Sequence, residues 1–159
     1  MISRQAKYAL RALIALGRLA PGESAQTSDI AKQQKIPKKF LEQILLRLKH
    51  QGIVQSRRGN RGGYALLKPA AAITFAQVLR TIDGPIAPLP CLSVIAYARC
   101  EDCNDEETCE IRRVFSRVIE PTRKILERTT IADALAGTAA DIEKLAPANL
   151  AATSLSHAS

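Results

Sequence analysis

The stretch "IVQSRRGNRGGYALLKP", residues 53–69, limits most narrowly what this chain can fold into. Two short runs, at 53–56 and 64–67, flank seven residues that contain three glycines and three arginines. Because glycine adopts positive φ angles without steric cost, this composition predicts a β-hairpin with a tight, basic turn at 57–63. The guanidinium groups would then stand where a phosphate backbone or a narrow minor groove could receive them.

Two helices are expected directly before this hairpin. Thr27 or Ser28 can cap a short helix over 29–34, and Asp29 suits its first turn. Pro37 can occupy the first position of a second helix, which ends at Gly52. Apolar residues spaced one, three and four apart form the face of this helix that is expected to point inward: Phe40, Leu41, Ile44, Leu45 and Leu48. A helix pair followed by a hairpin predicts a winged helix-turn-helix, and an ordinary charged hairpin is the alternative.

The rest of the pattern is mainly helical. A first helix is expected over 3–19, with Ser3 as its N-cap. Thr74 caps a compact helix that ends at Gly84, and a last short helix starts at Thr130. The predicted fold class is therefore mainly α, a winged helix-turn-helix domain with a small β-hairpin wing and a long C-terminal helix.

That long helix carries an apolar seam. From Ile111 to Leu126 the apolar residues alternate steps of three and four, as in a coiled coil. Such a seam favours pairing with a second copy of the chain, and packing on the chain's own first helix is the alternative, although both can hold. Pro121 lies inside the seam, where it costs about 3 kcal/mol or forces a kink.

These elements divide the chain into four parts. They are a DNA-binding domain at 1–84, a cysteine-rich sensor loop at 85–109, a dimerisation helix with a short terminal helix at 110–136, and an alanine-rich tail at 137–159 that is expected to be disordered.

The charge distribution separates the two halves of the chain. Residues 1–69 hold fourteen Lys and Arg against three Asp and Glu, whereas the remaining ninety residues hold nine against twelve. A basic front half favours a polyanion as partner, and a solvated basic surface without a partner is the alternative. Charged residues interrupt every long apolar run, so we expect a soluble, cytoplasmic protein with no membrane partner.

All four cysteines lie in the nineteen residues from Cys91 to Cys109, with the spacing C-x8-C-x2-C-x5-C. In a cytoplasmic protein, thiols gathered in this way indicate metal binding or redox chemistry rather than a structural disulfide. Six acidic residues in and just beyond this stretch would raise thiol pKa values, which disfavours bare reactive thiols.

The segment "FLEQILLRLKHQGIVQSRRGNRGGYALLKP" resembles the signature of the Rrf2 family of bacterial winged-helix regulators. The phrases "AKYALRALIAL" and "TTIADAL" fit as well, so the resemblance extends from Met1 to about Leu135. It implies a homodimer that crosses its long C-terminal helices and binds double-stranded DNA at a near-palindromic operator, with repression as the expected mode. A thiol oxidoreductase using Cys100 and Cys103 is the enzymatic alternative, but no βαβ pattern surrounds that pair, and no enzyme is expected.

The resemblance also implies which residues contact DNA. Glu42 and Gln43 would read bases, a carboxylate by accepting from cytosine N4 and an amide by pairing with adenine. Arg58 matches the wing arginine that enters the minor groove in related proteins, and Arg61 should add affinity. The full predicted set is Lys38, Lys39, Glu42, Gln43, Arg47, Arg57, Arg58, Asn60 and Arg61.

Iron–sulfur sensors of this family hold their cluster with three cysteines in the loop before the dimerisation helix. Cys91 and Cys109 match the first and last of these, whereas either Cys100 or Cys103 can be the middle ligand. At the place of the histidine that completes the set in the cluster regulator stands Arg112. The resemblance thus favours an all-thiolate site of four cysteines for a 2Fe–2S or 4Fe–4S cluster. A disulfide or sulfenic acid at Cys100 and Cys103 ranks second, and zinc third.

Overall fold

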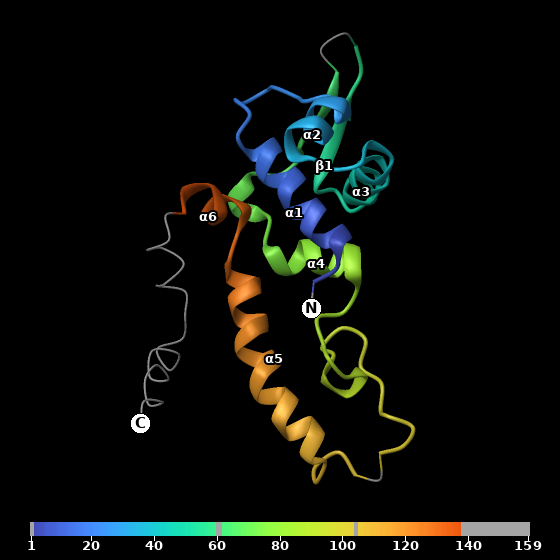
Figure 1. Ribbon diagram of the computed structural model, residues 1–159. Coiled ribbons are helices and arrows are strands. Elements are labelled where there is room, and N and C mark those ends of the chain that lie inside the picture. The colour runs from blue at the N-terminus through green and yellow to red at the C-terminus, as the bar shows by residue number, and fades with distance from the viewer. Residues whose placement is uncertain (1, 60–61, 104, 138–159) are drawn as a thin grey trace, which may run out of the picture.

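The computed structural model describes residues 2–59, 62–103 and 105–137. Its helices are α1 (Arg4–Gly17), α2 (Thr27–Gln34), α3 (Lys38–His50), α4 (Phe75–Asp83), α5 (Glu110–Arg128) and α6 (Ile131–Ala136). The strands are β1 (Val54–Arg57) and β2 (Gly63–Leu66), and short 3-10 helices lie at η1 (Ala70–Ala72) and η2 (Pro90–Leu92). Figure 1 shows α1 surrounded by the other helices of the DNA-binding half, with α5 projecting away from them. The predicted tail spans 137–159, and all of it beyond Gly137 lies outside the described residues.

The core forms around the apolar face of α1. Small alanines on this face let α3 and α4 approach closely, and larger aliphatic side chains fill the space between the helices. Fully buried large side chains include Leu13, Ile30, Leu41, Ile44, Leu45, Leu48, Ile53, Ile73, Val78 and Ile131. Phe40 was expected in this face, but it is 41% exposed and its ring meets the edge of Tyr8 at 6.5 Å. That prediction is wrong because Phe40 lies at the rim of the buried stripe rather than on it.

Of the four helix starts at α1, α2, α3 and α4, two follow the predicted chemistry. The Ser3 hydroxyl accepts from the Ala6 amide at 3.0 Å, and the Thr74 hydroxyl accepts from the Gln77 amide at 3.1 Å. The predicted cap of α2 is wrong, because α2 starts one residue earlier and its N-cap, Gln26, makes no side-chain capping bond. Pro37 is likewise the N-cap of α3 rather than its first residue, since its ψ of 127° is extended.

The wing is the predicted hairpin, with each strand shifted by one residue. Val54 pairs with Leu66 and Arg57 with Gly63, in antiparallel register. A third segment joins the hairpin, because the Ala25 amide donates to the Tyr64 carbonyl at 2.9 Å and the Tyr64 amide donates to the Ala25 carbonyl at 2.8 Å. The wing is therefore fixed to the loop that precedes α2, and its base moves with the helix-turn-helix.

Gly63 makes this attachment possible. Its φ is +154°, and a Cβ atom there would lie only 2.2 Å from the Ala25 carbonyl oxygen. We expect Gly63→Ala to lower the free energy of unfolding by about 2 kcal/mol or more, because backbone atoms on both sides must shift. Chemical denaturation would measure the loss. Gly59→Ala is the matched control, since Gly59 also has positive φ but open space around it; equal losses in the two variants would contradict the steric explanation.

Helix α5 runs without interruption through Pro121 (Figure 1). Its seam is divided between two environments. Towards the C-terminal end, Ile119 is buried and Leu126 packs against the core, so this part of the seam does pack on its own chain. The main neighbour is α4, however, and not the first helix that was expected. Towards the N-terminal end, four large apolar side chains of the seam are 41–61% exposed: Ile111, Val114, Phe115 and Val118.

After α5 the chain returns to the start of α4. The Phe75 amide donates to the Thr129 carbonyl, and the Ile131 amide donates to the Ile73 carbonyl, both at 2.9 Å. A capping box between Thr130 and Asp133 then starts α6, which packs on α1. None of the helices in the described ranges is both long and apolar enough to cross a membrane.

Candidate nucleic-acid interface and cysteine loop

The outer face of α3 presents the polar side chains predicted to read DNA. Lys39 and Gln43 lie opposite the buried Leu41 and Leu45, and both are exposed. Lys38 and Glu42 are exposed as well, and they form an ion pair of 3.9 Å one turn apart. Because such an exposed pair contributes little stability, either partner can leave it to contact a nucleic acid.

Arg47 is held differently from the other predicted contacts of α3. Its Nη1 atom lies 3.4 Å from the Gln5 Oε1 atom and 3.5 Å from the Ile82 carbonyl oxygen. The side chain therefore leans on α1 and on the last turn of α4, and it connects α3 to α4.

The outer face of α3 includes two further residues that the sequence prediction did not name. Leu46 is 47% exposed, and His50 is exposed at the end of the helix. They continue the row of Lys39 and Gln43 at spacings of three and four, the signal from which they could have been found. An exposed leucine on a polar face suits apolar contact with a thymine methyl group.

The arginines of the wing divide into two roles. Arg57 donates to the Gly22 carbonyl and so holds β1 against the loop after α1. Arg58, the next residue, has an exposed side chain at the start of the turn. Asn60 and Arg61, both predicted to contact DNA, lie outside the described residues.

The cysteine loop lies alongside α5, at the end of the molecule away from the wing (Figure 1). Cys91, in η2, is only 6% exposed, and the Ala98 amide donates to the Pro90 carbonyl at 3.3 Å, which brings the chain back onto η2. Cys100 is thereby brought near Cys91, and Cys103 lies near Cys109, so that each of these neighbours raises the pKa of the thiol beside it.

Cys109 also starts the long helix. It is the N-cap of α5, and its sulfur accepts from the Arg112 amide at 3.4 Å. A serine, threonine, aspartate or asparagine usually occupies this position. The last thiol of the loop is therefore part of the structure that begins α5.

The surroundings of the two central thiols favour the protonated form. Burial raises the pKa of Cys100 first, the hydrogen bond with Cys91 raises it further, and the charge of Asp102 adds a smaller contribution. Burial likewise raises the pKa of Cys103, followed by Cys109, whereas Arg99 opposes the shift. Acidic neighbours raise the thiol pKa values, as predicted, but desolvation by burial raises them more.

The donor set fits an iron–sulfur cluster in chemistry, since four thiols share one loop. The geometry is that of two thiol pairs, and in the part of the chain that the structure describes no three His, Cys, Asp or Glu side chains converge to hold a metal ion. All four cysteines are free thiols. Binding a cluster would require the pair of Cys91 and Cys100 to approach the pair of Cys103 and Cys109.

Comparison with known proteins identifies the class of the molecule. Residues 2–137 match the Rrf2 family, which is described as an iron-dependent transcriptional regulator. The chain belongs to the Rrf2 family. A Rhodobacter capsulatus protein described as rrf2-like is 46% identical over 139 residues, which cover 86% of this chain and 93% of that protein. The HTH-type transcriptional regulator CymR of Bacillus subtilis is 30% identical over 132 residues, covering 83% and 87% of the two chains.

Solved structures agree with this assignment to the Rrf2 family. The structure of CymR, the global cysteine regulator of B. subtilis, matches with a TM-score of 0.72 and 28% identity over 87% of this chain and 98% of CymR. IscR of T. potens matches with a TM-score of 0.68 over 95% and 96% of the chains, but at 21% identity this likeness shows the fold alone. The protein is thus a DNA-binding transcription regulator with a winged helix-turn-helix. Because the Rrf2 family consists of regulators, the oxidoreductase alternative has no support.

In this Rrf2 chain, Arg112 makes a contact of its own. It lies 3.9 Å from Glu106, and Glu106 accepts a hydrogen bond from the Tyr97 hydroxyl at 2.7 Å. That bond is the main reason why the pKa of Tyr97 is raised. The three side chains connect the two ends of the segment that carries Cys100 and Cys103.

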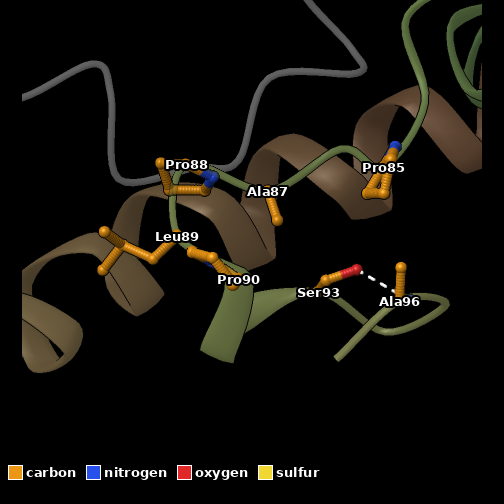
Figure 2. Close-up of a pocket in the computed structure, with 7 residues that line it drawn as sticks. All are labelled: Pro85, Ala87, Pro88, Leu89, Pro90, Ser93 and Ala96. Carbon is orange, nitrogen blue, oxygen red and sulfur yellow. Dashed lines mark hydrogen bonds between the residues drawn. The ribbon is translucent and has the colours of Figure 1, made fainter. Parts of the chain in front are cut away.

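The linker between α4 and the cysteine loop forms a shallow hollow of about 280 Å³. Figure 2 shows its lining residues beside the ribbon of α5, with the Ser93 hydroxyl accepting from the Ala96 amide at 3.0 Å. Its lining residues are Pro85, Ala87, Pro88, Leu89, Pro90, Ser93 and Ala96. Four consecutive lining residues, from Ala87 to Pro90, lead the chain into η2, so the hollow lies directly beside Cys91.

Proposed function

We propose that this regulator is a dimeric repressor whose operator affinity is controlled by the chemistry of the Cys91–Cys109 loop. The carrying observation is that the loop ends in Cys109, which caps the helix expected to join two copies. A change at the thiols therefore acts directly on the start of that helix. An iron–sulfur cluster is the first candidate for the controlling group, in keeping with the iron dependence ascribed to the family.

Contact with DNA is assigned to the outer face of α3 and to the wing. The exposed Gln43 and Glu42 have the groups needed to read base edges in a major groove. Lys38, Lys39 and Arg58 supply the positive charge that positions the protein on phosphates. A near-palindromic operator follows from a twofold-symmetric pair of reading heads.

The dimer is assigned to the N-terminal half of α5. Its exposed apolar side chains, at 41–61% exposure, form one continuous strip along the helix. Nothing in the described part of the same chain covers this strip, and a large apolar strip facing water marks an interaction surface. A second copy offers a strip of the same chemistry, which gives a self-complementary interface.

All four cysteines would hold the cluster in this proposal. When bound, a cluster supplies a redox-active centre that oxygen, nitric oxide or iron shortage can alter. The chain's own part is to bring two thiol pairs together: the 98–109 segment must close towards η2. Closure would move Cys109 and with it the first turn of α5.

A cluster-free thiol switch is the second candidate, and one observation favours it. Cys91 is the thiol that affects the pKa of Cys100 most, ahead of Cys103, so this pair differs from the Cys100–Cys103 pair expected from spacing. Two thiols would lose two electrons and two protons to one hydrogen peroxide, which forms the disulfide and two waters. Zinc remains the third candidate, because only Cys100 and Cys103 form a short C-x2-C hook.

Protein purified without oxygen tests the choice. We expect visible absorption with about two or four irons and matching sulfide per chain. A colourless sample free of iron and zinc that still responds to peroxide at its promoter would favour the thiol switch. A colourless sample with one zinc per chain would instead support the third candidate.

Replacing single cysteines should identify the ligands. Cys109→Ala and Cys91→Ala should each abolish iron binding under anaerobic reconstitution, because an iron site with one thiolate missing exchanges readily. Cys100→Ala decides the fourth ligand: loss of iron supports the all-thiolate site, whereas full retention contradicts it. Ser116→Ala, at a half-buried position of α5, is a control with intact thiols.

Operator affinity should fall steeply with salt. Lys38, Lys39 and Arg58 give about six phosphate contacts per dimer, which predicts a loss of about 10³-fold between 50 and 200 mM salt. Fluorescence anisotropy with a labelled promoter fragment would measure the slope. A flat salt dependence would contradict the assigned DNA interface but would leave the cysteine chemistry untouched.

A further inference from the structure

Helix α5 is fastened to the rest of its own chain by two polar contacts one turn apart. Arg123 donates from its Nη2 atom to the Leu92 carbonyl at 2.9 Å, in a partly buried position. Glu127 forms an ion pair with Arg80 of α4. The first contact holds the cysteine loop, and the second holds the DNA-binding domain.

We infer that Arg123 and Glu127 are the positioning residues that couple the cysteine loop to the DNA-reading helix. This inference rests on the proposed function, in which the loop controls operator affinity. Neither residue was indicated by the sequence motifs, because each acts through a partner more than thirty positions away.

The Arg123 contact is placed where a change at Cys91 must be felt. Its acceptor belongs to Leu92, the residue that directly follows Cys91 in η2. Cys91 is almost fully buried in η2, so drawing its sulfur into a cluster with the other three thiols is expected to move the η2 turn as well as the loop. Because the Leu92 carbonyl is part of the same turn, such a shift pulls on the Arg123 guanidinium or breaks its hydrogen bond. Figure 2 shows this turn and the linker lying along α5.

The Glu127 contact continues from α5 to the reading helix. Its partner Arg80 lies on α4, and the carbonyl of Ile82 on the same helix lies 3.5 Å from the Arg47 Nη1 atom of α3. Helix α4 packs on both α5 and α3, and it makes a polar contact with each of them. A displacement of α5 is thereby passed to the helix that carries Gln43.

Two variants and one control test the coupling. Arg123→Met keeps the length and the apolar stem of the side chain but removes the donor, and Glu127→Gln removes the charge that Arg80 binds. Lys124→Met removes a positive charge from the adjacent, exposed position of α5 and serves as the matched control. All three proteins are compared with the wild type as full chains.

The contact between Arg123 and the cysteine loop is tested by measuring how fast iodoacetamide alkylates each cysteine. In reduced, metal-free protein we expect the Cys91 peptide to react at least about tenfold faster in Arg123→Met, because η2 loses its support on α5. Glu127→Gln and Lys124→Met should stay within about twofold of the wild type. An unchanged Cys91 rate in Arg123→Met would overturn the positioning role of Arg123.

The coupling from the cysteine loop to α3 is measured by the ratio of the operator dissociation constants in two states of the protein. The states are the reduced metal-free protein and the same protein after reconstitution with iron and sulfide, or after peroxide treatment if no cluster forms. Arg123→Met and Glu127→Gln should each bring this ratio at least about threefold closer to one. The control Lys124→Met should keep the wild-type ratio. Because the contacts act in series, the Arg123→Met/Glu127→Gln protein should lose no more than the larger single variant.

The outcomes separate the two levels of the proposal. If the wild-type protein binds the operator equally well in all the states compared, the loop does not control operator affinity, and the coupling is overturned as well. A large wild-type ratio that both variants retain would overturn only the coupling through Arg123 and Glu127 and would leave the proposed sensor intact.

Discussion

Substituting Val114→Glu and Val118→Glu together should convert the protein into a monomer and lower operator affinity by more than about 100-fold. Both valines are 59% exposed on α5, so the fold of the single chain should tolerate glutamate there. In the proposed dimer the same carboxylates would be buried against a second apolar strip without a partner, which costs several kcal/mol per ion. Losing the second reading head then removes the benefit of binding two half-sites at once.

Light scattering coupled to size exclusion would give the mass, and anisotropy would give the affinity. Arg117→Gln with Lys124→Gln is the matched control, because it changes the net charge by the same amount on the exposed polar side of α5. The control should remain dimeric. A double-glutamate protein that stays dimeric and binds DNA normally would refute the assignment of the dimer interface to this strip.

Gln43→Ala should produce the largest loss of sequence discrimination. Gln43 stands on the outermost line of α3, opposite the buried Leu41 and Leu45. A side-chain amide that pairs with adenine contributes about 1–3 kcal/mol, and the dimer carries two copies. The expected loss at the operator is therefore about 2–6 kcal/mol, or about 30-fold to 10⁴-fold, with little change on unrelated DNA.

Lys39→Ala provides the contrast to this variant. Lys39 neighbours Gln43 on the exposed face, but as a point charge it should contact phosphate rather than a base. Its loss should weaken binding to all sequences alike and make the salt slope shallower by about two for the dimer. If Gln43→Ala weakened operator and unrelated DNA equally, base reading by Gln43 would be excluded.

Most of the fold followed from local patterns. The hairpin at 53–67 could be predicted because a glycine-rich turn between two short apolar runs has few other conformations, and the apolar spacing of α3 fixed its inward face. The predicted start of α2 differs from the observed one, because the residue before α2, Gln26, makes no side-chain capping bond that would mark the start in the sequence. Phe40 was misassigned because a stripe on a helical wheel does not reveal how far the facing core extends.

The arrangement of the sites was less accessible to sequence. The pairing of Cys91 with Cys100 depends on a backbone hydrogen bond from Ala98 to Pro90, which spacing among cysteines does not encode. Likewise Arg47 and Arg57 carry the charge expected of DNA contacts, yet carbonyl groups of Ile82 and Gly22 hold their guanidinium groups on the protein. Such choices depend on which acceptors the tertiary fold brings within reach.

The length of α5 has a mechanical consequence. Nineteen helical residues form a rod of about 28 Å, with the apolar strip and Cys109 near one end and the contact to α4 near the other. A tilt of about 5° about the Cys109 end would displace the opposite end by about 2.4 Å, as the rod length dictates. Hydrogen bonds to bases tolerate errors of only a few tenths of an ångström, so in the proposed function a small rotation at the thiol end of α5 would be enough to weaken operator contacts.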